Sequence, residues 1–468
     1  MLTSKSTPNV ILILADDMGY GDLGILGDGS SQTPNLDNLA GEGLLLTQCY
    51  SSSPVCAPAR ASLLTGRYPH RTGAIEIREL RGLTRLCTDE ITIADIFKEQ
   101  GYSTGLVGKW HLGAFGKEYH PNARGFDEFV GFRGGQSDYY DYILYYNQIT
   151  KNSNGSYLTD VITEESIKFI HRHSNEPFFL HIAYNAPHLP LQAPEADVKP
   201  FSNTGRFTKA VSTLYGMIFN MDRGIGHILD ALKELKLDDN TIVLFSSDNG
   251  PFFGGTGEKC AKRYNAKMNG SKSLVYEGGI KVPTIIRWPG VLKAGEVNNS
   301  FIHFTDWLPT LCSAAGIKIP NHLKLDGINT MPFLLGNANN NQVKRFWQWN
   351  RYTPLMECNA AMRDGPWKLL RPPIPEAMLP LDKDIIEDRF YEQNPDLFLG
   401  YIKEPLPVPS LSKPLEPLLY NIWDDPSEKV DLASAHPERV KQMLKELENW
   451  FNSVESDRRR TLFSNKFS

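Results

Sequence analysis

Residues 9–24, NVILILADDMGYGDLG, join an apolar run to two adjacent acids. The first seven residues are rich in Val, Ile and Leu, which predicts a strand of an α/β sheet. Asp16 and Asp17 follow where this strand ends, and the glycines after them allow the backbone to approach a neighbouring group closely. In an open α/β sheet, ligands bind beyond the carboxyl ends of the strands, so this stretch predicts a site at one edge of such a sheet.

Three further apolar runs end in charged or imidazole side chains. They are YSTGLVG before Lys109 and His111, PFFLHIAYNAP before His188, and TIVLFSS before Asp248 and Asn249. Such runs alternate with longer helical stretches up to about residue 320, which predicts an α/β fold with a large mixed, mostly parallel sheet between helix layers. The four strand ends then share one pocket.

The spacing of apolar residues predicts helices, and the character of the chain changes near residue 340. The helices are expected at 33–43, 89–100, 158–173, 208–235 and 305–315. We expect a catalytic domain over 1–340 and, after an Asn-rich linker, a smaller α+β subdomain over 341–468, with a short antiparallel sheet and a terminal helix at 436–455. The segment 371–417, rich in Pro and acids, is expected to be an extended wrap or loop.

Composition narrows the class of protein. The chain has 468 residues, 41% of them hydrophobic, and a net charge of −5. This balance gives no global attraction for nucleic acid or an anionic membrane, so we expect neither as a partner. An anionic substrate must be captured by local positive charge. The six cysteines show no CxxC or zinc-like spacing, so a disulfide scaffold is not expected, and the redox compartment stays open.

No apolar run reaches the length needed to cross a bilayer. MLTSKSTP at the start lacks the apolar region of a signal peptide. A periplasmic, secreted or lysosomal location is expected for the native precursor, and a cytoplasmic location stays open.

Cys56 lies in SSSPVCAPARASLLTGRYPH, residues 51–70. A short helix is predicted after Pro58 and ends at Gly66. Cys56 therefore precedes a helix N-terminus, where free N–H groups favour an anion, and Arg60 can fold back toward the same point. A buried structural cysteine is the alternative for a lone thiol.

Carboxylates from two strand ends predict a cation site. Asp16 and Asp17 repel each other unless a cation lies between them, and Asp248 with Asn249 adds two more oxygen-bearing side chains. Oxygen ligands suit Ca²⁺ or Mg²⁺. The set is one or two ligands short of a full shell, and a surface acidic turn is the alternative for the pair alone.

Lysines and histidines make up the rest of the predicted pocket. Lys109 and His111 lie two apart, so in an extended segment they face the same side. His188 lies in a rigid proline-flanked loop, and Lys272 precedes a glycine pair that marks a close approach, whereas His181 within a strand is assigned to structure. Each of these could be a solvated surface residue alone. Together with an arginine and a dication, they suit a doubly charged tetrahedral anion.

These motifs resemble those of the formylglycine-dependent (type I) sulfatases of the alkaline phosphatase superfamily, most closely the arylsulfatase A/B branch. CAPARASLLTGR is similar to their Cys-x-Pro-x-Arg signature. The other matching motifs occur in family order and are ILADDMGYGDLG, GKWHLG, APHLP, FSSDNG, KSLVYEGGIKVP, RDGPWKLL and LYNIWDDPSE. The resemblance implies an alkaline phosphatase-like fold.

The resemblance also implies a modified residue and a metal. Cys56 would be oxidised to formylglycine by a formylglycine-generating or an anaerobic sulfatase-maturating enzyme, and the aldehyde would hydrate to a diol. An oxygen of residue 56 would then complete a calcium shell (magnesium being the alternative) with Asp16, Asp17, Asp248 and Asn249. Arg60 would hold the diol, and Lys109 and Lys272 would bind the sulfate oxygens.

The family mechanism implies two proton transfers. One diol oxygen would attack sulfur in line, and His188 is the candidate acid for the leaving oxygen. The second hydroxyl would then lose a proton, for which His111 is the candidate acceptor, and inorganic sulfate would leave as the aldehyde is restored. A thiolate would form an adduct with no hydroxyl to drive its breakdown.

A sulfated carbohydrate is the expected substrate, a glycosaminoglycan or other polysaccharide fragment of which N-acetylgalactosamine 4-sulfate is one example. The Tyr-rich insertion could line a sugar subsite through His120, Arg133, Asp138, Tyr139 and Tyr140, or it could simply pack on the domain. The rival functions are a phosphonate or phosphodiester hydrolase of the same superfamily and an inactive glycan-binding relative.

Overall fold

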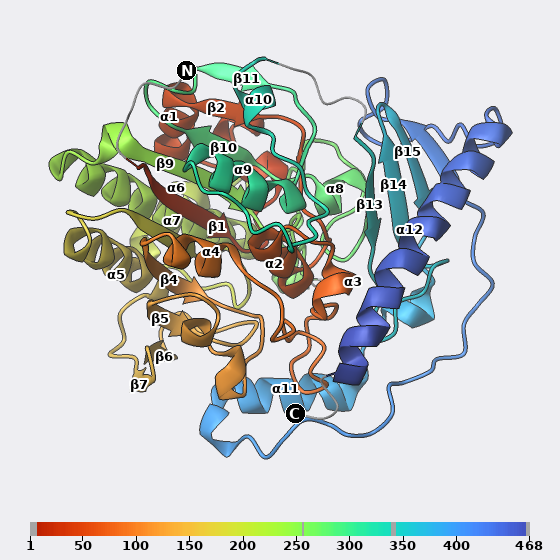
Figure 1. Ribbon diagram of the computed structural model, residues 1–468, viewed down its shortest axis with the longest axis horizontal. Coiled ribbons are helices and arrows are strands. Elements are labelled where there is room, and N and C mark those ends of the chain that lie inside the picture. Colours follow the sequence, from red (N-terminus) through yellow and green to blue (C-terminus); the bar gives the residue numbers. More distant parts are fainter. Residues whose placement is uncertain (1–6, 255–256, 338–342, 465–468) are drawn as a thin grey trace.

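The computed structural model describes residues 7–254, 257–337 and 343–464 (Figure 1). The expected boundary at 340/341 and most of the Asn-rich linker lie outside these residues, as do residues 1–6. The strands of the large sheet are β1 Asn9–Ala15, β2 Leu44–Leu46, β4 Ser103–Lys109, β5 Glu128–Phe132, β6 Ile143–Tyr146, β7 Ile149–Asn152, β8 Phe178–Ala183, β9 Thr241–Ser247, β10 Thr284–Arg287 and β11 Glu296–Asn298.

This sheet is mixed and mostly parallel. Its strand order is β11-β2-β10-β9-β1-β8-β4-β5-β6-β7. The five neighbours β9, β1, β8, β4 and β5 run parallel, whereas β10 and β6 run antiparallel to the strands beside them. A separate pair joins β3 Cys49–Tyr50 and β12 Ile302–His303. The predicted fold class is confirmed.

Helices cover both faces of the sheet. They are α1 Pro34–Glu42, α2 Cys56–Thr65, α3 Pro69–Thr72, α4 Ile93–Glu99, α5 Leu158–Arg172, α6 Glu195–Ser202, α7 Lys209–Glu234, α8 Glu277–Ile280, α9 Trp307–Ala314 and α10 Met331–Leu334. Five of the expected helices thus form, as α1, α4, α5, α7 and α9. None of the helices in the described ranges combines the length and apolar composition needed to cross a bilayer.

The central strand β1 shows why the run at residues 9–15 is apolar throughout. Side chains alternate between faces of a strand. Val10, Leu12 and Leu14 pack in one core cluster with α2, α4 and α9, whereas Ile11 and Ile13 pack in the other with α1, α5 and α7. Helices on both sides leave no face of this strand for polar residues.

The C-terminal part forms its own antiparallel sheet. Its strands are β13 Arg345–Gln348, β14 Ala360–Asp364, β15 Trp367–Arg371 and β16 Leu418–Asn421, in that order. One face packs on α12 Pro437–Ser464 through residues such as Leu369 and Trp450, and the other packs on the large domain through Ala361 and Leu370 against Val275 and Ile280. Figure 1 shows this sheet between α12 and α8.

The segment 371–417 departs from the expectation of an extended wrap. It contains the helix α11 Asp382–Gln393, and the terminal helix is also longer than predicted. Asp384 and Asp388, one turn apart, are buried there. Asp384 binds Arg81, and Asp388 accepts a hydrogen bond from the Leu80 N–H. Tertiary contacts therefore stabilise this helix, and such contacts cannot be predicted from the local composition of the segment.

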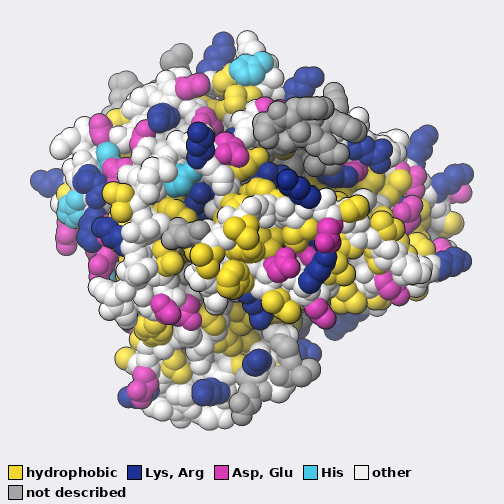
Figure 2. Space-filling model, turned by 90° about the horizontal axis from the view of Figure 1, so that it is seen from below, with side chains coloured by type: hydrophobic (Ala, Val, Ile, Leu, Met, Phe, Trp, Pro, Cys, Tyr) yellow, Lys and Arg dark blue, Asp and Glu magenta, His cyan; other side chains and the backbone are white. Residues whose placement is uncertain are grey.

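The helix α11 presents apolar side chains to the outside. It lies along the lower edge of Figure 1, and the view from below in Figure 2 shows hydrophobic side chains gathered on that face. Ile386 and Phe390, one turn apart on α11, are 68% and 48% exposed. This apolar surface lies outside the predicted pocket.

Candidate active site

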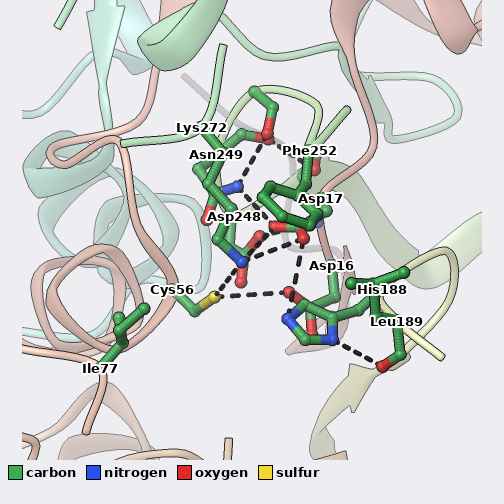
Figure 3. Close-up of polar contacts among 12 residues, drawn as sticks. Asp16, Asp17, Cys56, Ile77, His188, Leu189, Asp248, Asn249, Phe252 and Lys272 are labelled. Carbon is green, nitrogen blue, oxygen red and sulfur yellow. Dashed lines mark hydrogen bonds and ion pairs between the residues drawn. The ribbon is translucent and has the colours of Figure 1, made fainter. Parts of the chain in front are cut away.

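The structure brings the predicted strand-end residues together. β9, β1, β8 and β4 are parallel neighbours, so their carboxyl ends meet at one edge of the sheet. Figure 3 shows the side chains gathered there, namely those of Asp16, Asp17, Cys56, His188, Asp248, Asn249 and Lys272. The residues come from segments that are far apart in sequence, and only the fold joins them.

The turns after β1 and β9 hold each other in place. Asp17 takes a left-handed backbone conformation (φ 65°), which turns the chain sharply after the strand. Its N–H donates to Asp248 Oδ1 at 3.2 Å, and the Asn249 side-chain Nδ2 donates to Asp17 Oδ1 at 2.8 Å. The oxygen-bearing side chains therefore face one another across the two turns.

Two buried cations pair with this acidic group. Arg60, one turn into α2, donates from Nε to Asp248 Oδ2 at 2.9 Å and places its Nη2 2.8 Å from the same oxygen. Lys109, the last residue of β4, places Nζ 2.6 Å from Asp16 Oδ2. Arg60 thus folds back toward the start of its own helix, as expected.

The helix α2 begins at Cys56 itself rather than, as expected, after Pro58, whereas Gly66 ends the helix in a left-handed conformation, as predicted. The thiol sulfur lies 3.6 Å from Asp16 Oδ1 and 3.2 Å from Lys272 Nζ, and Cys56 is 1% exposed. Burial raises the pKa of Cys56 to about 12, although Lys109 and Lys272 pull it in the opposite direction. The residue as encoded stays a protonated thiol near neutral pH, which is a poor nucleophile.

Lys272 connects the thiol to the second carboxylate. Its Nζ lies 2.7 Å from Asp17 Oδ1. Burial would lower the pKa of Lys272, but the charge of Asp17, together with those of Asp16 and Asp248, outweighs it and raises the pKa, so the ammonium stays charged. The glycine pair after Lys272 does mark a close approach, because a Cβ on Gly279 would lie 1.9 Å from the Leu274 carbonyl oxygen.

The carboxylates have unlike environments. Burial opposes ionisation of Asp16, but Lys109 and Arg60 outweigh it and hold its pKa far below the ordinary value. Burial, together with the charge of Asp16, raises the pKa of Asp248 to about 6. The raised pKa of Asp248 reflects repulsion between neighbouring carboxylates, which a divalent cation between them would offset.

The residues present fit a divalent cation with oxygen ligands. Asn249 Oδ1 is buried and has no hydrogen-bond partner among the described residues, so it is free to coordinate. Ligand atoms of Asp16, Asp17, Cys56 and His188 all lie within 4.8 Å of one another. Carboxylate and amide oxygens are the ligands that Ca²⁺ and Mg²⁺ prefer.

His188 is held by its own loop and by Tyr139. Its Nδ1 donates to the Leu189 carbonyl at 2.8 Å, and its Nε2 lies 3.7 Å from Asp17 Oδ2. The hydroxyl of Tyr139 lies 2.9 Å from the carbonyl oxygens of both Asn185 and His188. Tyr139 therefore supports the loop that aims His188 Nε2 into the pocket.

His111 differs from the expectation in its backbone. β4 ends at Lys109, and His111 has a left-handed conformation (φ 58°). The segment is therefore not extended at His111, and the alternation of side chains along a strand does not explain the position of this residue. Its Nε2 donates to the Ile77 carbonyl at 3.2 Å, whereas its Nδ1 is buried and has no hydrogen-bond partner among the described residues. Burial and the charges of Lys109 and Arg60 hold the pKa of His111 well below its ordinary value.

The residues considered for a sugar subsite are mostly internal. His120 and Tyr139 are buried, at 2% and 0% exposure, and Arg133 donates to two backbone carbonyls. Tyr140 is 36% exposed, and Asp138 is half-buried with its carboxylate accepting from Gln192 and two backbone N–H groups. His181 is buried in β8 and bonds the Leu12 carbonyl, in line with its structural assignment.

Two residues that support the site lie outside the motifs found in the sequence. Glu79 is buried, with Oε1 3.8 Å from His111 Nε2, and burial raises its pKa to about 6. Asn359 lies just before β14 and bonds the backbone next to Lys272. Neither residue belongs to an apolar run or a strand end, so no local signal points to either.

Comparisons with known proteins identify the family of the chain. The model of the family described as Sulfatase matches residues 8–317, and a model described as N-sulphoglucosamine sulphohydrolase, C-terminal, matches residues 270–372. The chain belongs to the sulfatase family. The resemblance noted in the sequence is thereby confirmed.

Named relatives extend the comparison. The chain is 36% identical over 359 residues to human N-acetylgalactosamine-6-sulfatase, a match over 70% of this chain and 66% of that protein. It is 32% identical to mouse arylsulfatase J, over 94% of this chain and 75% of the relative. The crystal structure of Ps i-CgsB in complex with k-i-k-neocarrahexaose is similar, with a TM-score of 0.77, 32% identity, and coverage of 95% of this chain and 93% of that chain.

Proposed function

We propose that the protein is a sulfatase that hydrolyses a sulfate ester of a sulfated carbohydrate, with residue 56 acting as formylglycine. The observation that carries the proposal is the convergence of Arg60, Lys109 and Lys272 on Cys56 and Asp16 at a helix start. Three buried cations around one small residue suit a sulfate group, and the protonated thiol is unsuited to the reaction itself.

The modified residue and the metal have separate parts in this proposal. A formylglycine at position 56 supplies, as its hydrate, an oxygen nucleophile with a second hydroxyl for its own release, and calcium or magnesium supplies charge that raises the acidity of that hydrate. Asp16, Asp17, Asp248 and Asn249 would hold the metal with residue 56. The unpartnered Asn249 Oδ1 supports this assignment.

The cations of the pocket would bind and orient the sulfate group. Lys109 Nζ contacts Asp16 and Lys272 Nζ contacts Asp17, so each ammonium is paired with a different carboxylate. Both ammonium groups can turn from carboxylate to sulfate oxygens when a substrate and a cation are present. Arg60 stays bound to Asp248 and keeps the start of α2 in place.

Two histidines would move protons at opposite points of the reaction. His188 carries a proton on Nδ1 that the Leu189 carbonyl accepts, so its Nε2 is the atom that would hold the proton given to the leaving oxygen. His111 Nε2 donates to the Ile77 carbonyl, so its Nδ1 carries the free lone pair. The neutral ring with an unpartnered Nδ1 suits a proton acceptor during release of sulfate.

A sulfated amino sugar or polysaccharide fragment is the substrate class that we propose. The names of the relatives support it, since one is an N-acetylgalactosamine-6-sulfatase and one solved structure contains k-i-k-neocarrahexaose. A periplasmic, secreted or lysosomal location and a dedicated maturation enzyme remain predictions for this protein.

The test is turnover by protein produced together with a maturation enzyme. Intact mass of the peptide containing residue 56 measures conversion to formylglycine. Converted protein should hydrolyse an aryl sulfate faster than an aryl phosphodiester. The Cys56→Ala variant should not hydrolyse the aryl sulfate. Faster diester cleavage would indicate a phosphodiester hydrolase, and binding of defined sulfated saccharides without turnover would indicate a glycan-binding relative.

A further inference from the structure

The C-terminal sheet reaches the candidate active site through one buried amide. Asn359, just before β14, is fully buried and has a positive φ of 46°. Its Oδ1 accepts from the Val275 N–H at 3.1 Å, and its Nδ2 donates to the Ser273 carbonyl at 2.8 Å and to the Trp349 carbonyl at 2.7 Å. Every hydrogen of this amide is used, which a carboxylate or a hydroxyl at this position could not match.

The backbone that Asn359 holds is the backbone next to Lys272. Ser273 has a left-handed conformation (φ 78°), which a non-glycine residue adopts only when its surroundings impose it. On one side its N–H donates to the Pro54 carbonyl at 2.8 Å, and on the other its carbonyl accepts from Asn359. A chain of bonds thus runs from Asn359 through Ser273 to the segment that precedes Cys56.

A second buried side chain of the same sheet holds that segment directly. Trp347 in β13 is 1% exposed, and its Nε1 donates to the Ser51 carbonyl at 2.7 Å. The Ser51 hydroxyl in turn donates to the Asp248 carbonyl at 2.6 Å. The small sheet therefore forms hydrogen bonds to the segment before Cys56 and to the segment after Lys272. The Cys56 Sγ and the Lys272 Nζ lie 3.2 Å apart.

We infer that Asn359 is a positioning residue that sets Lys272 relative to residue 56, and that Trp347 does the same for the segment before residue 56. This inference rests on the proposed function, because it assigns to Lys272 the binding of the sulfate group. The C-terminal sheet then completes the sulfate site of the large domain. A catalytic group displaced by an ångström can lose about 100-fold in rate, so small backbone shifts here are sufficient.

The experiment compares Asn359→Ala with Asn350→Ala. Asn350 is a matched control, since it is a buried asparagine of the same subdomain whose amide bonds only neighbours such as Thr353 and Leu355. In converted protein, Asn359→Ala should lower kcat/KM for an aryl sulfate on the order of 100-fold and weaken inhibition by inorganic sulfate. Asn350→Ala should lose melting temperature but keep the wild-type sulfate inhibition constant.

A double-mutant cycle separates positioning from general damage. If Asn359 acts through Lys272, Asn359→Ala should cost little more activity in a Lys272→Ala background. Full additivity of the two losses, or equal effects of the Asn359 and Asn350 variants, would overturn the inference. Trp347→Phe keeps an aromatic ring in the core, loses the donor to Ser51 together with some packing, and carries the test of the segment before residue 56 if Asn359→Ala does not fold.

Failure of the proposed function gives a different result. Wild-type protein that contains formylglycine and does not turn over sulfate esters would refute that function. Calorimetry can measure the binding of inorganic sulfate to unconverted protein with calcium present. This affinity still depends on the position of Lys272. Equal sulfate affinity in wild type and Asn359→Ala there would refute the positioning role by itself.

Discussion

The ammonium of Lys272 lies 3.2 Å from the sulfur of Cys56 and 2.7 Å from a carboxylate oxygen of Asp17. It therefore stands between the residue proposed to carry the nucleophile and a proposed metal ligand. An ammonium at this point can contact the sulfate group throughout the reaction, including the transition state, where charge on the oxygens changes most.

Replacing Lys272 should reduce catalysis strongly. We expect Lys272→Ala to lower kcat for an aryl sulfate on the order of 100-fold or more, as for loss of one preorganised donor in a buried site. Lys262→Ala is the control, because Lys262 is exposed in the same stretch of chain. Steady-state kinetics of converted protein measure the effect, and equal rates for the two variants would contradict this role.

Removing the hydroxyl of Tyr139 should loosen the loop that carries His188. Tyr139→Phe leaves the His188 carbonyl without its donor, whereas the Asn185 carbonyl still accepts from the His188 N–H, and we expect a cost of about 1–3 kcal/mol in unfolding free energy. We expect kcat to fall more than KM changes, since His188 is proposed to act on the leaving oxygen. Denaturant unfolding and initial rates measure both effects.

Tyr157→Phe is the matched control for this prediction. Tyr157 donates its hydroxyl to the Gln192 carbonyl in the same loop, four residues beyond His188. The two variants should lose similar stability, and the Tyr157 variant should keep more of its activity. A larger loss of kcat in Tyr157→Phe would show that Tyr139 does not aim His188.

The strand-end residues were predictable from sequence, whereas their supports were not. Asp16 and His188 follow apolar runs, and a run that ends in charge is a local pattern that parallel strands bring to one edge. Asn359 contributes nothing to such a pattern, because its partners Ser273 and Val275 become neighbours only through packing of the small sheet. The left-handed backbone of His111 likewise depends on tertiary contacts rather than on a strand period.

Removing a divalent cation should lower both activity and stability. Calcium bound to the folded state alone stabilises it by about 2.7 kcal/mol when its free concentration is about 100 times the dissociation constant. We expect a chelator to lower the melting temperature of wild type and calcium to restore it. Asn249→Leu removes the unpartnered Oδ1, so the melting temperature of this variant should respond less to calcium. An unchanged response would exclude Asn249 as a ligand.

The buried carboxyl of Asp388 should make the folded protein less stable as pH rises. Burial, with the neighbouring charge of Glu392, raises the pKa of Asp388 to about 8, although Arg78 opposes this. Between its ordinary pKa of 3.8 and about 8, the folded state binds a proton that the unfolded chain has lost. The free energy of unfolding must therefore decrease as the pH increases through this window.

Asp388→Asn tests this linkage without removing the hydrogen bond, because the amide oxygen still accepts from the Leu80 N–H. Burial raises the pKa of Glu392 to about 7 and that of Glu79 to about 6, so these neighbours keep part of the pH dependence. Urea unfolding should show that the free energy of unfolding decreases less from pH 6 to pH 8 in Asp388→Asn than in wild type. Asp384→Asn, which breaks the ion pair with Arg81, should be destabilised at both values, and equal pH slopes for wild type and Asp388→Asn would contradict the raised pKa.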